Sequence, residues 1–213
     1  MILLGLTGSI GMGKSETAKM FRREGVPVYD SDAEVHKLQG PGGKALPAIE
    51  AAFPGVVVDG VLDRQALGRR VFGKPEELRR LERIIHPMRG KAQRDFLHQM
   101  ARRGEDVVVM DVPLLFEINS EKYYDATMVV SAPAYIQRRR VLARPGMTAE
   151  KLDGILAQQM PDAEKRKRAD FIIPSGLGKA FALQHVRAIL RELQNYRGTI
   201  WPWGALRRYK GRR

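Results

Sequence analysis

Residues 7–15 read TGSIGMGKS and directly follow the apolar run ILLGL. Gly8, Gly13, Lys14 and Ser15 match the pattern G-x-x-x-x-G-K-[ST], in which a glycine-rich loop joins a strand to a helix. Glycines let such a loop turn its N–H groups inward around an anion, and the helix that follows adds the positive end of its dipole. The feature therefore predicts an α/β fold with a phosphate site between its first strand and its first helix.

The loop motif also assigns roles to its own residues. Lys14 is expected to contact the β- and γ-phosphates of a nucleotide, and Ser15 is expected to bind the Mg²⁺ ion that bridges them. The sequence contains no N/T-K-x-D motif, which GTPases use to recognise guanine, so ATP is favoured over GTP. ATP and Mg²⁺ are therefore the expected cofactors. The expected nucleotide-binding residues of the loop are Gly8, Gly11, Met12, Gly13, Lys14, Ser15 and Glu16.

Short apolar runs alternate with amphipathic stretches along the chain, which is the pattern of an α/β protein with a buried parallel sheet. Strands are expected at 2–7, 26–30, within 106–117, at 125–132 and at 171–174, with a weaker signal at 56–58. Helices are expected at 15–24, 64–72, 75–85, 86–103, 134–144, within 145–160 and at 179–194. A further helix is expected to begin with SDAE, because Ser31 at the N-cap and Glu34 three residues later have the form of a capping box.

Composition excludes several classes of protein. The chain has 213 residues, 44% of them apolar, so it is long enough to bury a large core, and no apolar run approaches the length of a membrane span. It has no cysteine, which excludes disulfides and thiolate metal sites. The apolar start is too short for a signal peptide. We therefore expect a cytoplasmic protein without a membrane partner.

The net charge of +13 has two ordinary explanations, nucleic-acid binding or the handling of phosphorylated metabolites. Six lysines and arginines and no acids lie in residues 196–213. Two internal stretches are also strongly basic, residues 64–103 and residues 137–168. The internal stretches are the more informative ones, because a small-molecule kinase needs a second anion-binding surface and a basic cover.

Beyond the loop, the chain resembles the dephospho-CoA kinases over about residues 1–176. The motifs that carry the resemblance are LTGSIGMGKS, VYDSDAEVHKL, DGVLDRQALGRRVF, LERIIHP, DVPLLFE, IQRRRVLAR and QMPDAEKRKRADFII. The D-x-D before a helix and the PLLFE after a strand are peculiar to this family among P-loop kinases. The family transfers the γ-phosphoryl group of ATP to the 3'-hydroxyl of the adenosine ribose in dephospho-CoA.

The resemblance implies a three-layer P-loop fold with a five-stranded parallel sheet, a helical substrate-binding insert and a helical lid. It divides the chain into a nucleotide-binding core (1–59, 104–136 and 169–195), an insert that binds dephospho-CoA (60–103), a lid (137–168) and a basic C-terminal tail (196–213). No feature of the sequence sets the oligomeric state, and we expect a monomer or a weak homo-oligomer.

Asp32 matches the second aspartate of the family's D-x-D and is the candidate catalytic base or hydroxyl-orienting group. It follows the second expected strand, and ligands of open α/β sheets bind outside the carboxyl ends of the strands. A carboxylate there can accept the proton of an attacking hydroxyl or orient its oxygen. The alternative is that Asp32 only complements the dipole of the helix that it begins.

Four basic residues of the lid match positions of the family, and two of them, Arg140 and Arg144, match arginines that approach the ATP phosphates. Arg140 and Arg144 are four residues apart and are expected to share a helix face. Their charge would offset the charge that builds up during transfer, so both are catalytic candidates beside Lys14. Lys165 and Arg166 match a second lid pair, whereas neighbouring arginines such as Arg138 fit an ordinary solvated helix face.

The remaining candidates are less specific. Asp111 ends an apolar run where a carboxylate can hold the Mg²⁺ shell, although it fits a structural role equally well. His86, with Pro87 after it, matches the H-P of the family's substrate domain. Arg64 and Arg89 are expected to meet the pyrophosphate of dephospho-CoA.

The chain departs from the family pattern in two places. Where the family has A-D-x-V-I-x-N-x-G near the adenine, this chain has ADFIIPSGLG, so Ser175 is the expected adenine-site residue but lacks the amide of asparagine. The tail 196–213 lies outside the resemblance. It is expected to be a flexible basic extension, or a weak RNA-binding strip in which Trp201, Trp203 and Tyr209 stand among arginines.

Two alternatives to a dephospho-CoA kinase stay open on the sequence alone. One is a nucleotide or nucleoside kinase of similar fold. The other is a P-loop ATPase that associates with nucleic acid through its basic tail. Neither changes the expected small-molecule substrate ATP, and nucleic acid is expected as a partner only if the tail binds it.

Overall fold

The computed structural model describes residues 1–202. The chain forms two compact units. The first consists of Met1–Tyr29 together with the chain from Met100 onward, and the second is Asp30–Gln99. Residues 30–59, which the sequence analysis assigned to the nucleotide-binding core, belong to the second unit.

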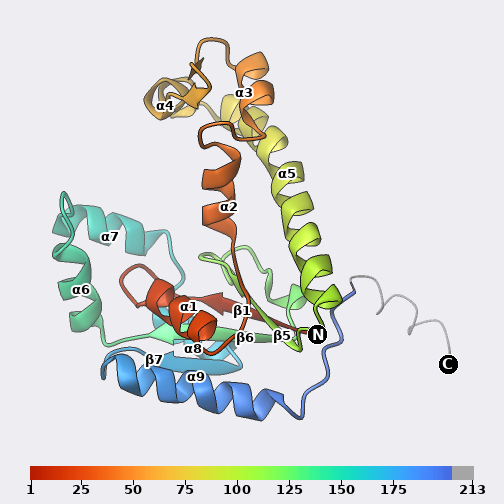
Figure 1. Cartoon of the computed structure of the whole chain (residues 1–213). Helices are drawn as coiled ribbons and strands as arrows, with labels where there is room; N and C mark the ends of the chain where they lie inside the picture. Colours follow the sequence, from red (N-terminus) through yellow and green to blue (C-terminus); the bar gives the residue numbers. More distant parts are fainter. Residues whose placement is uncertain (203–213) are drawn as a thin grey trace, which may run out of the picture. The chain divides into compact units, whose positions relative to one another are not determined.

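A five-stranded sheet in the order β2-β5-β1-β6-β7 forms the centre of the first unit (Figure 1). Its strands are β1 (Ile2–Thr7), β2 (Val28–Asp30), β5 (Val107–Asp111), β6 (Ala126–Ser131) and β7 (Phe171–Pro174). β1 pairs in parallel with β5 and with β6, so Leu4 lies between Val109 and Ala126. β6 also pairs in parallel with β7. The expected α/β fold with a five-stranded parallel sheet is confirmed.

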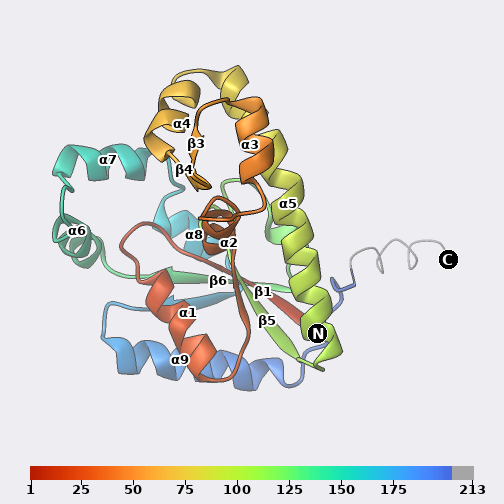
Figure 2. The ribbon, with the colours of Figure 1, turned by 45° about the horizontal axis from the view of Figure 1, so that its top comes forward.

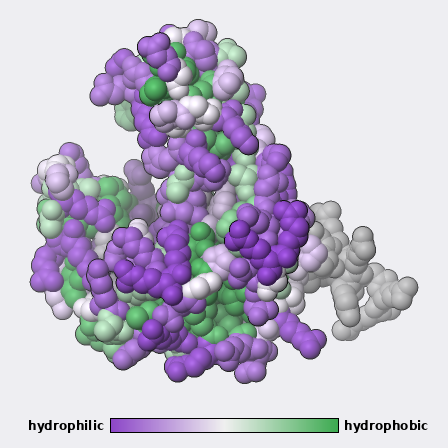
Figure 3. All heavy atoms as spheres, viewed as in Figure 1, coloured by the Kyte–Doolittle hydropathy of each residue, from purple (hydrophilic) through white to green (hydrophobic). Residues whose placement is uncertain are grey.

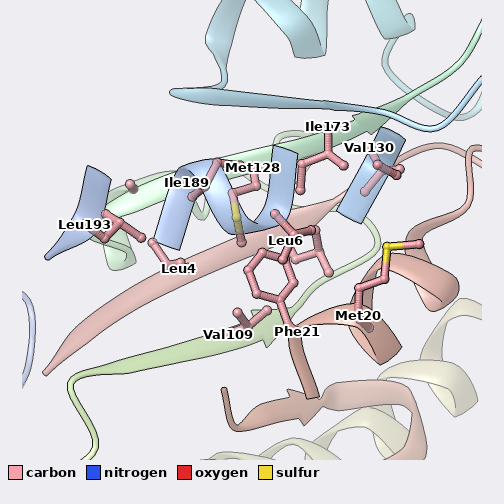
Figure 4. Close-up of a cluster of buried hydrophobic side chains, with 14 of the residues drawn as sticks. Leu4, Leu6, Met20, Phe21, Val109, Met128, Val130, Ile173, Ile189 and Leu193 are labelled. Carbon is pink, nitrogen blue, oxygen red and sulfur yellow. The ribbon is translucent and has the colours of Figure 1, made fainter. Parts of the chain in front are cut away.

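Helices pack on this sheet because their apolar positions recur on one face. Those of the first unit are α1 (Lys14–Arg23), α6 (Ala134–Leu142), α7 (Ala149–Ala157), α8 (Asp162–Arg168) and α9 (Lys179–Leu193), with a short 3₁₀ helix, η1 (Glu121–Tyr123). Phe21 of α1 and Ile189 of α9 belong to one buried cluster with Leu6 and Met128 of the sheet (Figure 4). Phe21 has no exposed surface, and full burial of its side chain contributes about 2 kcal/mol of transfer free energy.

The second unit consists of helices and one small hairpin (Figure 2). Its elements are α2 (Ser31–Leu38), α3 (Leu46–Ala52), β3 (Val57–Val58), β4 (Val61–Leu62), α4 (Arg64–Val71) and most of α5 (Pro75–Arg102). Leu38, Ile49, Phe53, Leu62 and Leu67 form its own buried cluster. The strand signal at 56–58 is therefore half of an antiparallel hairpin, and its partner β4 and helix α3 were not expected.

The prediction of two helices at 75–85 and 86–103 was wrong, because α5 runs without a break and contains Pro87. Proline removes one helical hydrogen bond. Leu81, Ile84 and Met88 nevertheless pack against the same cluster on both sides of it. Burial along this one face keeps the helix continuous.

Two other local predictions were wrong. The N-cap of α2 is Asp30 rather than Ser31, since Asp30 Oδ1 accepts hydrogen bonds from the N–H groups of Asp32 (3.1 Å) and Ala33 (2.9 Å). Arg144 does not share a helix face with Arg140, because α6 ends at Leu142 and Arg144 lies in the following turn.

Hydrophilic residues dominate the surface drawn in Figure 3, with hydrophobic residues showing between them. Within residues 1–202 no helix combines the length and the apolar character that spanning a bilayer requires.

Helix α8 docks on the loop after β5 through a buried ion pair. Lys165 is completely buried, and its Nζ lies 2.8 Å from Glu117 Oε1, which also accepts a hydrogen bond from the Met160 N–H (3.0 Å). Burial raises the pKa of Glu117, but the bonds from Lys165 and Met160 outweigh it, so the pKa lies below its ordinary value of 4.5. Arg168 adds a partly exposed ion pair with Glu121.

The chain after α9 is tied to the start of the sheet by Asp125. Its Oδ1 accepts hydrogen bonds from the Ile200 N–H (3.0 Å) and from the N–H and hydroxyl of Thr199, while its Oδ2 accepts one from the Leu3 N–H (2.8 Å). Gly198 lies against Met1, where a Cβ would come 2.1 Å from the carbonyl oxygen. The expectation of a flexible extension from residue 196 is therefore wrong for 198–200, whereas Trp203 and Tyr209 lie outside the described residues.

We predict that Lys165→Met lowers the free energy of unfolding by about 3 kcal/mol, because it leaves Glu117 without its buried partner. Lys167→Met on the same helix removes only the exposed pair with Glu164 and should cost less than about 0.5 kcal/mol. Urea denaturation of both variants measures the difference. Because the pKa of Glu117 is lowered by folding, the contribution is present above pH 4.5 and is lost as the pH falls through the lowered value. The difference in the free energy of unfolding between wild type and Lys165→Met should therefore become smaller in acid. A difference independent of pH would contradict the ion pair between Lys165 and Glu117.

We predict that Asp125→Ala lowers the free energy of unfolding by about 2 kcal/mol, because several N–H groups lose a charged acceptor. Amide exchange at Thr199 and Ile200 should accelerate in the same variant. Asp106→Ala, which removes an exposed carboxylate just before β5, is the matched control and should change stability by less than about 0.5 kcal/mol. An equal decrease in the free energy of unfolding in the two variants would show that Asp125 does not anchor residues 198–200.

Candidate active site

The glycine-rich loop leaves β1 after Thr7 and enters α1 at Lys14. Gly11 and Gly13 have φ values of 75° and 96°, which favour glycine over residues with a Cβ. Gly13 is the N-cap of α1 and supplies no side chain to the first N–H groups of that helix. These groups therefore remain available to an anion, together with the positive end of the helix dipole.

Lys14 and Asp111 place a charge pair beside the loop. Lys14 Nζ forms an ion pair with Asp111 Oδ1. Asp111 is the last residue of β5 and is only 3% exposed. Ser15, the next residue of the motif, is exposed in the first turn of α1. The parallel pairing of β1 with β5 thus brings the motif lysine and the candidate Walker-B carboxylate together.

Arg140 reaches the loop from α6. Its Nη1 donates to Ser175 Oγ (3.0 Å) and to the Gly11 carbonyl (3.4 Å), and its Nη2 donates to the Ser175 carbonyl (2.7 Å). The guanidinium is therefore fixed by three hydrogen bonds, one to the loop backbone and two to Ser175. Arg140, a candidate for binding phosphate, is thus held in place by groups of the protein itself.

Ser175 follows β7 and is 9% exposed. Its hydroxyl donates to the Met12 carbonyl while accepting from Arg140. Met12 is also buried, and its sulfur accepts a hydrogen bond from the Ala132 N–H (3.1 Å). The serine that replaces the family's asparagine thus has its hydroxyl committed to the loop and the arginine, and an adenine contact by this group remains a prediction.

Two glutamines that the sequence analysis did not single out also bind the loop. Gln137 of α6 and Gln159, two residues after the end of α7, both bond to the main chain of Ile10. Neither belongs to a spacing pattern that sequence inspection could have detected, because the contacts join residues more than a hundred positions apart.

The other nucleotide candidates are more exposed. Glu16 of α1 pairs with Lys179 (2.8 Å) and Lys19 (2.7 Å), and the hydrogen bond from Lys179 is the largest cause that lowers the pKa of Glu16 to about 2. Arg144 and Arg166 are exposed. Lys165, in contrast, is buried in the pair with Glu117 and is not available on the surface of α8.

The second unit holds the remaining candidates. Asp32 is exposed in the first turn of α2, whereas Asp30 uses its carboxylate to cap that helix. Arg64 Nη2 lies 2.9 Å from Nδ1 of His36, a histidine to which no role was assigned. His86 and Arg89 of α5 line a cavity of about 910 Å³ together with Arg79 and Arg83. Its lining combines three arginines, which suit a phosphorylated ligand, with Glu76, Glu82 and apolar side chains.

Comparisons with known proteins agree with this arrangement. A sequence model described as dephospho-CoA kinase matches residues 2–177. The dephospho-CoA kinase of Mesorhizobium japonicum is 56% identical over 199 residues, which are 93% of this chain and 100% of the relative. The dephospho-CoA kinase of Paramagnetospirillum magneticum is 59% identical over 166 residues, or 78% of each chain.

Solved structures show the same fold. A crystal structure of the Thermus thermophilus protein TT1252 is 37% identical, with a TM-score of 0.75, and the match covers 90% of this chain and 97% of the other. A dephospho-CoA kinase from Campylobacter jejuni, 24% identical with a TM-score of 0.60 over 90% and 96% of the two chains, supports the fold alone. The phosphate loop, its lysine–aspartate pair and these matches lead to one conclusion: the chain belongs to the dephospho-CoA kinase family.

Proposed function

We propose that this protein transfers the γ-phosphoryl group of ATP to the 3'-hydroxyl of the ribose in dephospho-CoA, giving CoA and ADP. The observation that carries the proposal is the family match over residues 2–177, which includes the phosphate loop with its Lys14–Asp111 pair. In this reaction the hydroxyl oxygen bonds to the γ-phosphorus, the bond to the β–γ bridging oxygen breaks, and the hydroxyl proton leaves.

Lys14 and the loop N–H groups bind the triphosphate in this proposal. Ser15 and Asp111 would hold Mg²⁺, which would neutralise part of the charge of the phosphates. The donor set fits the ion, because Mg²⁺ takes oxygen ligands and usually combines one or two protein groups with phosphate and water. The ion pair that Asp111 makes with Lys14 supports its assignment to the phosphate end of the site.

The lid supplies the positive charge that transfer requires. Among residues 1–202, Arg140, Arg144 and Arg166 form no ion pair with a carboxylate, unlike Arg138 and Arg168, which do. Arg140 is bound only to neutral groups, so its charge is not cancelled. We assign Arg140 and Arg144 to the phosphates, where their charge is most effective in the transition state.

Asp32 is the proposed group for the acceptor hydroxyl. Its carboxylate is exposed, whereas the neighbouring Asp30 is occupied by two N–H groups of the helix. This division supports the choice of the second aspartate, because a carboxylate that caps a helix is already committed as an acceptor. Asp32 would accept the hydroxyl proton or orient the oxygen for in-line attack.

The helical unit would bind dephospho-CoA, with Arg64, His86 and Arg89 as contacts for its phosphates. The cavity lined by His86 and Arg89 supports this assignment. We further propose that residues 60–103 act as the acceptor-binding insert and residues 137–168 as the lid. A cytoplasmic monomer or weak homo-oligomer is the corresponding expectation.

We predict that purified protein with Mg-ATP converts dephospho-CoA to CoA and ADP in equal amounts. Adenosine, other nucleosides and AMP, offered side by side, should react with kcat/KM lower by about 100-fold or more, because phosphate-binding groups of the helical unit would be left unpaired. Coupled ADP assays measure the rates, and ³¹P NMR identifies the 3'-phosphate. A nucleoside that reacts faster than dephospho-CoA would establish the rival nucleoside kinase.

We predict that Asp32→Asn lowers kcat by at least about 100-fold while the KM for ATP changes by less than about threefold, because the proton acceptor is lost and the nucleotide site is kept. Glu34→Gln in the first turn of the same helix removes an equal charge and is the matched control. If Asp32 acts only on the helix dipole, the two variants should show the same small effect, and this result would remove the assignment.

A further inference from the structure

The main chain of Ile10, near the middle of the phosphate loop, is held by two side-chain amides. The Ile10 N–H donates to Gln159 Oε1 (3.1 Å), and Gln137 Nε2 donates to the Ile10 carbonyl (2.8 Å). An N–H needs an oxygen partner and a carbonyl needs an N–H partner, so the network itself fixes the orientation of both amides. Both hydrogen-bonding groups of this loop residue are satisfied from outside the loop.

The two glutamines come from two different places in one segment. Gln137 lies in α6 and is 7% exposed, and Gln159 follows α7. In the residues 137–168 that we propose as the lid, Gln137 is the first residue and Gln159 lies between α7 and α8. Figures 1 and 2 both show the loop between β1 and α1 beside α6.

The packing around these bonds is tight. A Cβ at Gly11 would lie 2.4 Å from Val141 Cγ2 and 3.1 Å from the Gln137 carbonyl oxygen. Only glycine lets the backbone come this close to α6, so the hydrogen bonds at Ile10 are formed where loop and helix are already in contact.

We propose that Gln137 and Gln159 are positioning residues, which fix the phosphate loop at Ile10 to two points of the lid and thereby couple the lid to the loop N–H groups that face the transferred phosphoryl group. The proposal rests on the proposed kinase function. A loop whose N–H groups are already in place does not have to reorganise as charge develops, so the effect belongs to the transition state. A displacement of about 1 Å at the reacting group is enough to slow transfer greatly.

The main test compares two adjacent glutamines. Gln159→Leu removes the acceptor of the Ile10 N–H, whereas Gln158→Leu makes the same change at an exposed neighbour. We expect Gln159→Leu to lower kcat by about tenfold with the KM for ATP within about threefold, the effect of one lost hydrogen bond in the transition state. Gln158→Leu should leave both values within about twofold. Equal effects in the two variants, or an unchanged kcat in Gln159→Leu, would overturn the proposal.

Amide exchange at Ile10 gives a readout that does not depend on activity. In free wild-type protein the Ile10 N–H should be protected, and Gln159→Leu should accelerate its exchange by about tenfold or more. Gln159→Glu keeps an acceptor oxygen and should restore most of the protection, even though its charge weakens ATP binding. Protection that is the same in wild type and Gln159→Leu would show that the bond is not formed.

A double variant tests whether the two glutamines act through the same residue. If both act through Ile10, Gln137→Leu should also lower kcat by about tenfold, and the pair together should lower it by much less than the product of the two effects. Full multiplicativity would contradict a shared role. Urea denaturation of each variant establishes that the compared proteins are folded.

The outcomes separate this proposal from the proposed function. If wild-type protein does not phosphorylate dephospho-CoA, the proposed function fails, while exchange at Ile10 still decides whether the contact exists. If wild type is active and Gln159→Leu is equally active, only the positioning role fails.

Discussion

The path of the main chain through residues 8–13 is the constraint on which the rest of the site depends. An N–H group that the loop presents to an anion cannot also pair with the loop's own carbonyls, so apart from the Met12 N–H, which donates to the Ser9 carbonyl (3.1 Å), the loop is stabilised by other parts of the chain. Here Arg140 and Ser175 bind the carbonyls of Gly11 and Met12, and two glutamines bind Ile10. The loop is thus preorganised by side chains that come from the second half of the sequence.

The features of the fold that follow from local chemistry could be predicted from the sequence. β1 is buried at every position and consists of apolar residues and glycine up to Thr7, because the sheet buries both of its faces, and the G-K-S at the start of α1 marks the phosphate loop. Errors arose where two local signals competed. Asp30 and Ser31 are both good N-caps, and the structure uses the one whose side chain reaches the next N–H groups. Pro145 follows Arg144 directly, a signal that α6 ends before that residue.

The parts of the site that depend on tertiary contacts could not be predicted in this way. Nothing in the spacing of Gln159, Lys165 or Asp125 distinguishes them from solvated polar residues, yet each contacts a group far away in the sequence. Lys165 illustrates the reason. In the sequence it belongs to the run KRKR, and only the packing of α8 on the loop that contains Glu117 buries this lysine and leaves its neighbours in solvent.

The chemistry of the groups that hold the loop bears on how it works. A carboxylate at position 137 or 159 would place a negative charge close to the triphosphate, at a cost of about 3 kcal/mol for unit charges about 6 Å apart at an effective dielectric constant of 20. A lysine or arginine at position 159 would have no acceptor for the Ile10 N–H. Neutral amides fix the backbone of Ile10 without either effect. The attractive charge is then left to Lys14, which can follow the β- and γ-phosphates, and to Arg140, whose guanidinium is fixed by carbonyl and hydroxyl oxygens that do not cancel it. A loop held by uncharged groups and flanked by fixed cations can be rigid and strongly positive at the same time, which is what phosphoryl transfer by positioning and electrostatics requires.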